Sequence, residues 1–415
     1  MASPRVLIIG CGVAGPVIAL LLKQKGYYPI IFERAETLDD IGASVMIFPN
    51  GLKVLDRVGD VSRRLLENGP NVEWLLDYRA EGPELGGSDV PREWATRYGK
   101  PAVGVKRTLI ASWLRDLVKE NDIELREGWS LERIEDTKDD VTAYFGGGRS
   151  ETGTFLVGCD GLRAISRKLL LARQGISDGL PTFTGIIQTS GISPTPPSFR
   201  SRSGIRNWYG AGVHFVCYQI THEHTSWALT QPEDSGEEAS WCLFGSDERQ
   251  AILGRLVERL RSEGWDKDVV ELVASSHRLI KYGIFDRPAL EPEQWYSSRC
   301  VMVGDAVHPV SVHAGQGANQ ACEDCYYLVN LLPSFDPSGL SNSQLHVAFS
   351  TYAKTQQPHV SQVAIGARKI GAMRVVPAAG RDERDEAVRR LMSDREGVAC
   401  QVRLSILKAV LATCI

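Results

Sequence analysis

The chain lacks any apolar run long enough to cross a membrane. No stretch in its 415 residues reaches the ~18–20 consecutive apolar positions that a membrane-spanning helix requires. Segment 404–415 is apolar but short and interrupted, so we expect it to pack as a helix on the body of the protein. A helix that lies on a membrane surface or binds a partner is the alternative. The first predicted strand begins at Arg5, which leaves no room for a secretory signal.

The chain also has no excess of basic charge. Its 47 Lys and Arg residues are outnumbered by 51 Asp and Glu residues, which gives a formal net charge of −4. No general basic field would therefore recruit nucleic acid. The cysteines number nine, an odd count, and lie mostly in apolar runs, which favours reduced thiols and a cytoplasmic location over a disulfide framework. The pair Cys322 and Cys325 is read as buried thiols. His222 and His224 have no further ligand pattern around them, so no metal site is expected.

What is present is the composition of a globular protein with two or three domains, 43% hydrophobic and 24% charged. Residues 5–9 form a short, branched, apolar run typical of a buried parallel strand. Gly10, Gly12 and Gly15 follow as G-x-G-x-x-G at the start of a helical run, a pattern that lets a pyrophosphate approach the backbone. A second strand ends at Glu33, about 20 residues on, where a carboxylate binds ribose hydroxyls. This context predicts a dinucleotide site; the alternative is an ordinary strand–turn–helix unit that binds nothing.

Two further short apolar strands end in acidic residues. Residues 154–158 lead into Asp160 and Gly161, and residues 300–304 lead into Asp305. Side chains that follow parallel strands lie at the carboxyl edge of the sheet, where ligands of α/β proteins bind.

The middle of the chain has a different character. Residues 182–244 alternate and are rich in aromatics, which predicts an antiparallel sheet. We expect residues 81–99 to form a surface loop and residues 248–276 to be helical. The chain beyond residue 352 is also predicted to be helical, and its charge run at 381–390 is read as a solvated helix face.

Three motifs in one order resemble the single-component FAD-dependent aromatic hydroxylases, the flavoprotein monooxygenases related to salicylate and para-hydroxybenzoate hydroxylase. They are the glycine motif at Gly10, Asp160-Gly161, and Gly304-Asp305-Ala306 with His308-Pro309. The resemblance implies an α/β fold, with a Rossmann-like FAD-binding domain, an inserted antiparallel β-sheet substrate domain and a helical C-terminus. The expected FAD-binding domain comprises residues 1–75, 100–181 and 282–360, the substrate domain residues 76–99 and 182–281, and the C-terminal helical segment residues 361–415.

The resemblance also implies the cofactor contacts. The glycine motif matches the pyrophosphate loop, and Glu33 matches the acid on the adenosine ribose. Arg107 matches an arginine beside the flavin, Asp160 a residue linked to FAD and the nicotinamide cofactor, and Asp305 the acid on the ribityl chain. The segment 315–319 faces the pyrimidine end of the isoalloxazine. The full set of expected FAD contacts is Gly10, Gly12, Val13, Ala14, Gly15, Glu33, Arg34, Ala43, Ser44, Arg107, Asp160, Asp305, Gly315, Gly317, Ala318 and Asn319.

The sequence departs from the family at several of these places. Ala164 stands where Asp-Gly-x-x-Ser-x-x-Arg has its serine, although Arg167 remains. Ser44 replaces a glycine, and Val312 replaces the proline in front of the flavin. Segment 352–359 carries glutamines and a histidine where arginines are usual.

Four histidine or tyrosine side chains are candidates for further roles. His214 and Tyr218 are four apart on an alternating strand and therefore share a face, which either lines the substrate site or packs. His313, in the loop that should face the flavin, either touches substrate or does not. His308 is read as structural, with a proton carrier as the alternative.

These features predict an FAD-dependent monooxygenase that uses NAD(P)H and O2 to insert one oxygen atom into a small organic substrate, of the type met in secondary metabolism. The nicotinamide cofactor is expected to bind transiently, because no second dinucleotide fold is evident. A flavin-dependent oxidase or cyclase that inserts no oxygen is the nearest alternative, motivated by Ala164 and Val312. A nucleotide-binding regulatory or structural protein without turnover is the other.

Overall fold

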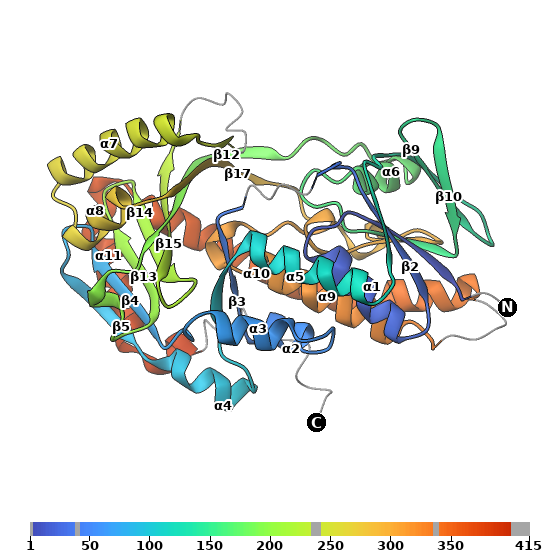
Figure 1. Ribbon diagram of the computed structural model, residues 1–415, viewed down its shortest axis with the longest axis horizontal. Coiled ribbons are helices and arrows are strands. Elements are labelled where there is room, and N and C mark those ends of the chain that lie inside the picture. Colours follow the sequence, from blue (N-terminus) through green and yellow to red (C-terminus); the bar gives the residue numbers. More distant parts are fainter. Residues whose placement is uncertain (1–2, 38–41, 234–241, 335–339, 400–415) are drawn as a thin grey trace.

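The computed structural model describes residues 3–37, 42–233, 242–334 and 340–399. The predicted apolar helix at 404–415 lies outside the described residues. Figure 1 shows two halves, one built around the N-terminal strands and one around a second sheet, with long helices running between them. Among the helices of the described ranges, none combines the length and the apolar character that crossing a membrane requires.

The first half is a parallel sheet of five strands, as the N-terminal pattern predicts. Its order is β18 (Cys300–Met302), β11 (Phe155–Gly158), β1 (Arg5–Ile9), β2 (Tyr28–Glu33) and β7 (Glu124–Glu127). All five strands are short, and the four apart from the edge strand β7 are apolar and almost wholly buried, because helices and a small sheet enclose them.

Helices and a three-stranded sheet form this enclosure. The helices are α1 (Ala14–Gln24), α5 (Arg107–Glu120), α6 (Ile165–Arg173) and α9 (Gly317–Leu331). The small antiparallel sheet contains β8 (Leu131–Asp136), β9 (Val141–Phe145) and β10 (Arg149–Gly153). Phe145 of β9 stacks on Phe32 of β2 with ring centroids 4.5 Å apart, which joins the small sheet to the parallel one.

The second half is a sheet of eight strands. Its order is β16 (Cys242–Leu243), β17 (Arg278–Asp286), β12 (Thr182–Pro194), β15 (His224–Pro232), β14 (His214–Gln219), β13 (Gly204–Tyr209), β4 (Trp74–Arg79) and β5 (Glu84–Ser88). The antiparallel sheet predicted from residues 182–244 is confirmed, since β12, β13, β14 and β15 pair antiparallel, and β13 also pairs in parallel with β4 from earlier in the chain. The expectation of a loop at 81–99 is wrong: β5 and α4 (Trp94–Tyr98) lie there, and Trp94 is buried.

The second sheet has one apolar and one polar face, because paired residues project to the same side. Trp208, Phe215, Trp227 and Leu229 form the apolar face, which packs on α7 (Ser246–Ser262) and α8 (Lys267–Ala274). Figure 1 shows these two helices on the outer side of the sheet. The opposite side is called here the polar face and carries, strand by strand, Asp77, Asn207, Tyr209, His214, Val216, Tyr218, Ser226, Ala228, Thr230, Gln188, Ser190 and Tyr282.

Short elements connect the two halves. Strands β3 (Ser44–Ile47) and β6 (Val103–Lys106) form an antiparallel pair, followed in space by α2 (Pro49–Leu55) and α3 (Val61–Asn68). The long helix α10 (Asn342–Arg374) packs on α9 and ends near the second sheet, and α11 (Arg381–Ser393) packs on β5 (Figure 1). The boundaries of the expected domains stay a prediction.

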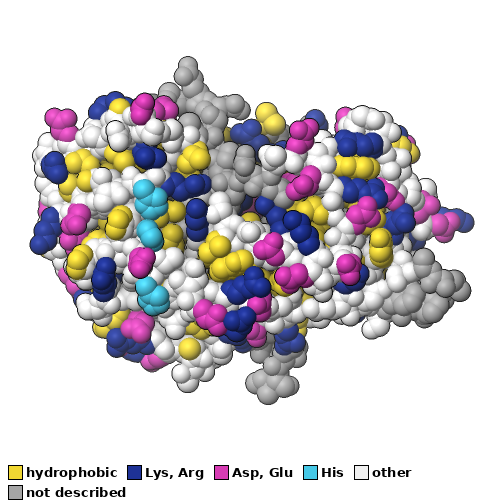
Figure 2. All heavy atoms as spheres, in the orientation of Figure 1, with side chains coloured by type: hydrophobic (Ala, Val, Ile, Leu, Met, Phe, Trp, Pro, Cys, Tyr) yellow, Lys and Arg dark blue, Asp and Glu magenta, His cyan; other side chains and the backbone are white. Residues whose placement is uncertain are grey.

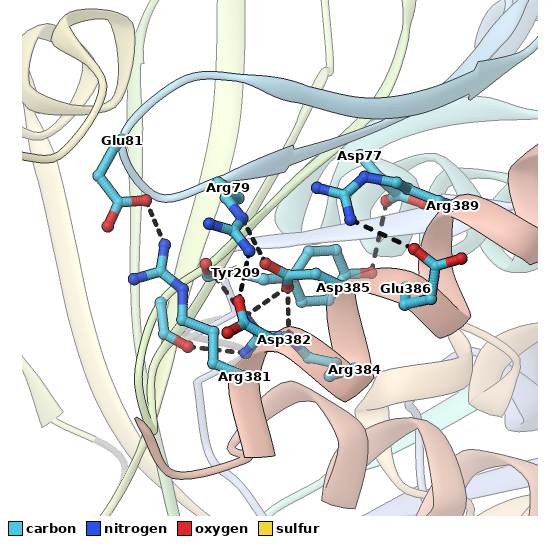
Figure 3. Close-up of polar contacts among 11 residues, drawn as sticks. Asp77, Arg79, Glu81, Tyr209, Arg381, Asp382, Arg384, Asp385, Glu386 and Arg389 are labelled. Carbon is cyan, nitrogen blue, oxygen red and sulfur yellow. Dashed lines mark hydrogen bonds and ion pairs between the residues drawn. The ribbon is translucent and has the colours of Figure 1, made fainter. Parts of the chain in front are cut away.

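The charge run at 381–390 is only partly a solvated helix face, so that expectation is wrong for two of its members. Arg384 and Asp385 are 4% and 0% exposed. Arg384 donates to the carbonyl oxygen of Gly210 at 2.7 Å, and Asp385 lies 2.6 Å from Arg79 of β4. Figure 3 shows how Arg79 and Asp385 approach each other between sheet and helix, with Arg381 reaching Glu81 beside them. The paired charges fasten α11 to the edge strands. Elsewhere, basic and acidic side chains are interspersed over the face shown in Figure 2.

A buried carboxylate, Asp324 of α9, holds the turn that follows β18. It accepts a hydrogen bond from the backbone N–H of Gly304 at 2.7 Å and from Gln356 of α10 at 3.1 Å, and it pairs with His308. Burial opposes protonation of His308, but Asp324, together with the nearby Asp305, outweighs burial and raises the pKa of the imidazole. These contacts support a structural role for His308.

Gly15→Ala should destabilise the first half. A Cβ at this position would stand 2.0 Å from the carbonyl oxygen of Gly10, so backbone must shift. We expect the free energy of unfolding to fall by about 1–3 kcal/mol, as for other overpacked sites. Urea unfolding measures this. Gly254→Ala, at an open and exposed position in α7, is the matched control and should be neutral or stabilising by about 0.5–1 kcal/mol. An unchanged Gly15→Ala protein would contradict the close strand–helix contact.

His308→Asn should cost stability in a pH-dependent way. The raised pKa means that the paired, protonated imidazole stabilises the fold below the unfolded pKa of about 6.5 and that this contribution is lost as pH rises through the folded pKa. The difference in unfolding free energy between the parent and His308→Asn, about 1–3 kcal/mol at acid pH, should shrink toward alkaline pH. Chemical unfolding from pH 6 to 9 tests it, with the exposed His222→Asn as control. A difference that grows with pH would refute the assignment.

Candidate functional site

The glycine loop between β1 and α1 is shaped to receive a ligand. Gly10 has φ +103°, and a side chain there would meet the carbonyl oxygen of Cys159 at 2.6 Å. Gly12, in contrast, is exposed, and no atom lies within 4 Å of where its Cβ would stand. The loop therefore presents open backbone at the N-terminus of α1, where the helix dipole and free N–H groups favour phosphate.

Glu33 lies beside this loop at the end of β2. Its carboxylate accepts hydrogen bonds from the backbone N–H groups of Cys11 at 2.8 Å and Ala35 at 3.0 Å. The side chain keeps accessible surface, and the neighbouring Arg34 is exposed. A fixed, partly accessible carboxylate next to a phosphate loop has the chemistry that ribose hydroxyls require. Val13 and Ala14 lie at the turn into α1, the first half-buried and the second buried.

Asp160 follows β11 and organises the next turn. It accepts hydrogen bonds from both the backbone N–H, at 2.9 Å, and the hydroxyl of Ser166 in α6. Ser166 thus supplies a hydroxyl although Ala164 occupies the position of the family's serine. Burial raises the pKa of Asp160, with the Ser166 hydrogen bonds acting in the opposite direction. Arg167 has a structural role in this structure, since it is 1% exposed and pairs with Asp178 at 3.2 Å.

Asp305 emerges after β18, in the turn that Asp324 fixes. Its side chain is exposed, yet the surrounding protein raises its pKa, opposed by the nearby His308 and Arg107. One carboxylate oxygen lies 3.7 Å from where a Cβ on Gly317 would stand, so the third motif and the start of α9 are adjacent. An accessible acid this deeply surrounded by protein is suited to accept hydrogen bonds from ligand hydroxyls. The exposed Arg107 side chain lies within electrostatic reach of it.

Asn319 fastens the loop at the start of α9. Its side chain accepts from the backbone N–H of Phe48 at 2.9 Å and donates to the carbonyl oxygens of Met46 and Gly315, each at 3.0 Å. Asn319 is buried, so its side chain positions the loop, whereas Gly315, Gly317 and Ala318 keep accessible surface. Gly315 has φ +64°, which permits the turn. Together these groups fit FAD: open backbone for phosphates, two accessible acids for hydroxyls and free helix N–H groups for the flavin.

The polar face of the second sheet meets the predicted flavin-contact strand β3. Ser44 Oγ lies 2.8 Å from the hydroxyl of Tyr218 and donates to Ser226 Oγ at 2.6 Å, while Ala43 just before it is half-buried. Burial raises the pKa of Tyr218 to about 12, so the phenol is neutral. Val216 and Ala228, paired at the centre of this face, retain accessible surface. The face therefore offers small side chains in the middle and hydrogen-bonding groups around them.

His214 and His313 lie close to one end of the polar face. His214 Nε2 is 3.1 Å from the amide oxygen of Asn207, whose nitrogen donates to Asp77 at 2.8 Å. Burial, with Arg374 and His313 nearby, lowers the pKa of His214 well below its usual value. Burial first and Arg374 second lower the pKa of His313 to about 3. Both rings are neutral and buried, so neither acts as a cation at neutral pH.

Sequence reasoning missed several side chains of this face. The hydroxyl of Tyr282 donates a hydrogen bond to Gln188, and Gln188 donates to Thr230 at 3.0 Å. The alternation of β12 and β15 could have placed Gln188 and Thr230 on this face. Arg374 donates to His313 Nδ1 at 3.2 Å from the end of α10. No pattern in the sequence marks Arg374, because the contact joins residues 61 positions apart.

Comparisons with known proteins agree with this geometry. The FAD binding domain family matches residues 4–364. The 3-amino-4-hydroxybenzoate 2-monooxygenase of Streptomyces cremeus is 28% identical over 336 residues, 79% of this chain and 78% of that protein. The 6-hydroxynicotinate 3-monooxygenase of Pseudomonas fluorescens is 26% identical over 378 residues, 87% and 89% of the two chains. Among solved structures, Klebsiella pneumoniae HpxO with FAD and uric acid has a TM-score of 0.81 at 19% identity, covering 97% of this chain and 96% of that one. The chain therefore belongs to the FAD binding domain family, and with it to the FAD-dependent monooxygenases of aromatic-hydroxylase type that its motifs resemble.

Proposed function

We propose that the chain is an FAD-dependent monooxygenase that uses NAD(P)H and O2 to insert one oxygen atom into a small, electron-rich organic substrate. The observation that carries the proposal is the contact between β3, a predicted flavin neighbour, and the polar face, through Ser44, Tyr218 and Ser226. A substrate on the accessible centre of that face, at Val216 and Ala228, would lie between the sheet and the cofactor loops.

Bound FAD supplies the redox chemistry, accepting hydride from NAD(P)H and activating O2. The chain's own residues bind and orient. The glycine loop and Glu33 would hold the adenine dinucleotide end, and Asp305 the ribityl hydroxyls. The N–H groups at the start of α9 would stabilise negative charge on the flavin ring. The apolar side of the sheet and its helices exclude water from behind the substrate.

The substrate end of the site is built from neutral hydrogen-bonding groups. Tyr218 is protonated, and His214 and His313 are neutral. We infer that Tyr218, which keeps accessible surface, orients substrate by hydrogen bonding, and that none of the three side chains brings a permanent charge to the site. The Streptomyces cremeus and Pseudomonas fluorescens relatives are named as monooxygenases, of 3-amino-4-hydroxybenzoate and 6-hydroxynicotinate, which supports oxygen insertion over the oxidase or cyclase alternative. Hydroxylation is the reaction that those names favour.

The isotope of the inserted oxygen tests the function. With 18O2, NADPH or NADH, and a panel of hydroxylated aromatic acids and secondary-metabolite aromatics, the FAD-loaded protein should yield a product heavier by one 18O atom. Mass spectrometry of products and stopped-flow reduction of the flavin provide the readouts. Flavin that is reduced and reoxidised while a substrate is converted without 18O uptake would establish the oxidase or cyclase alternative instead.

Asp305→Ala should lose FAD while the chain stays folded. The carboxylate is accessible and close to Gly317, so its loss removes an acceptor for ligand hydroxyls and leaves no buried charge unpaired. A charge-assisted hydrogen bond contributes about 1.5–3 kcal/mol, so FAD affinity should fall roughly 10- to 100-fold. The absorbance ratio at 450 and 280 nm after dialysis measures retained FAD. Asp116→Ala, an exposed acid on α5, is the control. Full retention of FAD by Asp305→Ala would remove Asp305 from the site.

A further inference from the structure

A buried chain of polar side chains lies behind the start of α9, next to the segment expected to face the flavin. Asn50 of α2 donates from Nδ2 to Gln316 Oε1 at 3.1 Å and also forms a hydrogen bond with the carboxyl group of Glu323. All three residues are 1% exposed. Gln316 directly precedes Gly317, an expected flavin contact that keeps accessible surface. Asn50 therefore links the carboxyl group of Glu323 to the flavin end of the same helix.

The contacts around this chain of side chains leave little room for it to rearrange. Gln320 donates to the same Gln316 oxygen at 3.3 Å. A Cβ on Gly51 of α2 would stand 2.3 Å from Asn319 Oδ1, so α2 and α9 are in close contact here. Protein interiors are packed as densely as crystals and transmit displacements. A change in the hydrogen bonds of Asn50 should therefore reach the backbone at the start of α9.

Glu323 also lies close to His359 of α10, in the segment where this chain departs from the family. His359 Nε2 is 3.8 Å from Glu323 Oε2, and the histidine is 5% exposed. This separation is too long for a hydrogen bond but short enough for an ion pair. Arginines are usual in this segment, and an arginine carries a fixed charge that would keep a neighbouring carboxylate ionised. Histidine can be neutral, so it does not fix the charge of Glu323.

The surroundings of Glu323 favour its neutral form. Burial and then the adjacent Asp324 raise the pKa of Glu323 to about 8, while the hydrogen bond from Asn50 acts in the opposite direction. Asp324 already pairs with His308 of the turn after β18, so the charge of that imidazole is balanced. Arg57, beyond α2, lies over the ring of the tyrosine three residues further along α9. At neutral pH the two adjacent acids therefore hold one proton, and at alkaline pH they become two buried negative charges.

We propose that Glu323 is a positioning residue for FAD: its neutral carboxyl group keeps Asn50 and Gln316 in place at the start of α9, and loss of its proton at alkaline pH weakens FAD binding. An ionised Glu323 accepts more strongly from Asn50 and competes with Gln316 for its N–H groups. The added charge also opposes the negative charge that the N–H groups at the start of α9 would stabilise on the flavin ring. This role concerns FAD binding and is independent of oxygen insertion.

FAD affinity should be constant around neutral pH and fall as pH rises through the pKa of Glu323, about 8, because the neutral form is the one that supports binding. The test dilutes the FAD-loaded full-length chain into buffers from pH 6.5 to 9.5 and obtains the dissociation constant from the fluorescence of released FAD. For the parent we expect the dissociation constant to rise roughly 3- to 10-fold from neutral pH to the alkaline end, since one linked proton changes affinity by at most about tenfold per pH unit.

Two variants should remove the alkaline fall in affinity by opposite routes. Glu323→Gln keeps the shape of the side chain but cannot ionise, so its FAD affinity should stay level over this pH range. His359→Arg places a fixed cation beside Glu323, which should hold the carboxylate ionised and compensated throughout, so the fall should disappear there as well. Glu120→Gln, which alters an exposed acid on α5, is the matched control and should keep the pH profile of the parent.

The pH profile separates a positioning role from a merely structural one. Loss of a structural contact would weaken FAD binding and lower the unfolding temperature of Glu323→Gln equally at every pH. The proposal is overturned by that result, by a parent dissociation constant that stays level up to pH 9.5, or by an alkaline fall that persists in either variant. Oxygen insertion from 18O2 is measured at neutral pH on the same parent protein. Its failure would refute the proposed function and leave the FAD dissociation constants unaffected.

Discussion

The carboxylate of Asp324 is the contact on which the arrangement of the site depends. It holds the backbone of Gly304, the imidazole of His308 four residues further on and the amide of Gln356 in α10, so the turn after β18 and α10 are both joined to α9. The turn that presents Asp305, the helix that begins at Gly317 and the long helix α10 are thereby fixed to one another. Because α10 continues to Arg374, the same contact also sets where the end of this helix meets the second sheet. A buried carboxylate stabilises such an arrangement only when hydrogen bonds and an ion pair satisfy it, and Gly304, His308 and Gln356 provide these for Asp324.

The second sheet contributes to function through the difference between its two faces. Large aromatic and aliphatic side chains on one side pack on α7 and α8 and stabilise the sheet from that side. The polar face is therefore free to carry hydroxyls, amides and small side chains that would be costly in a core. Strand alternation makes both faces from the same segments of sequence, so a one-residue slip in register would exchange them.

Much of the first half could be predicted from the sequence because its signals are local. Apolar strands, glycines at fixed spacing and acids at strand ends lie within a few residues of one another, and the N-terminal unit follows them closely. The parallel pairing of β4 with β13 joins segments about 130 residues apart, and no short pattern encodes it. Arg384 and Asp385 look like a solvated charge run until the distant edge of the sheet supplies Arg79 and the carbonyl of Gly210. Ser166 likewise replaces the missing serine from two residues further on.

The departures from the family's arginines have a coherent physical consequence. Glu323 and Asp324 are adjacent buried acids on α9, and the segment of α10 that faces them provides Gln356 and His359. Gln356 gives Asp324 a hydrogen bond but no charge, so His308 is its cationic partner. His359 lies 3.8 Å from Glu323, and burial, assisted by the neighbouring Asp324, raises the pKa of Glu323 to about 8. The raised pKa favours the neutral form of Glu323 at neutral pH, while Asp324 pairs with His308. With glutamine and histidine in place of the family's arginines, this core has one positive charge fewer. The neutral form of Glu323 removes one negative charge, so the buried charges stay balanced.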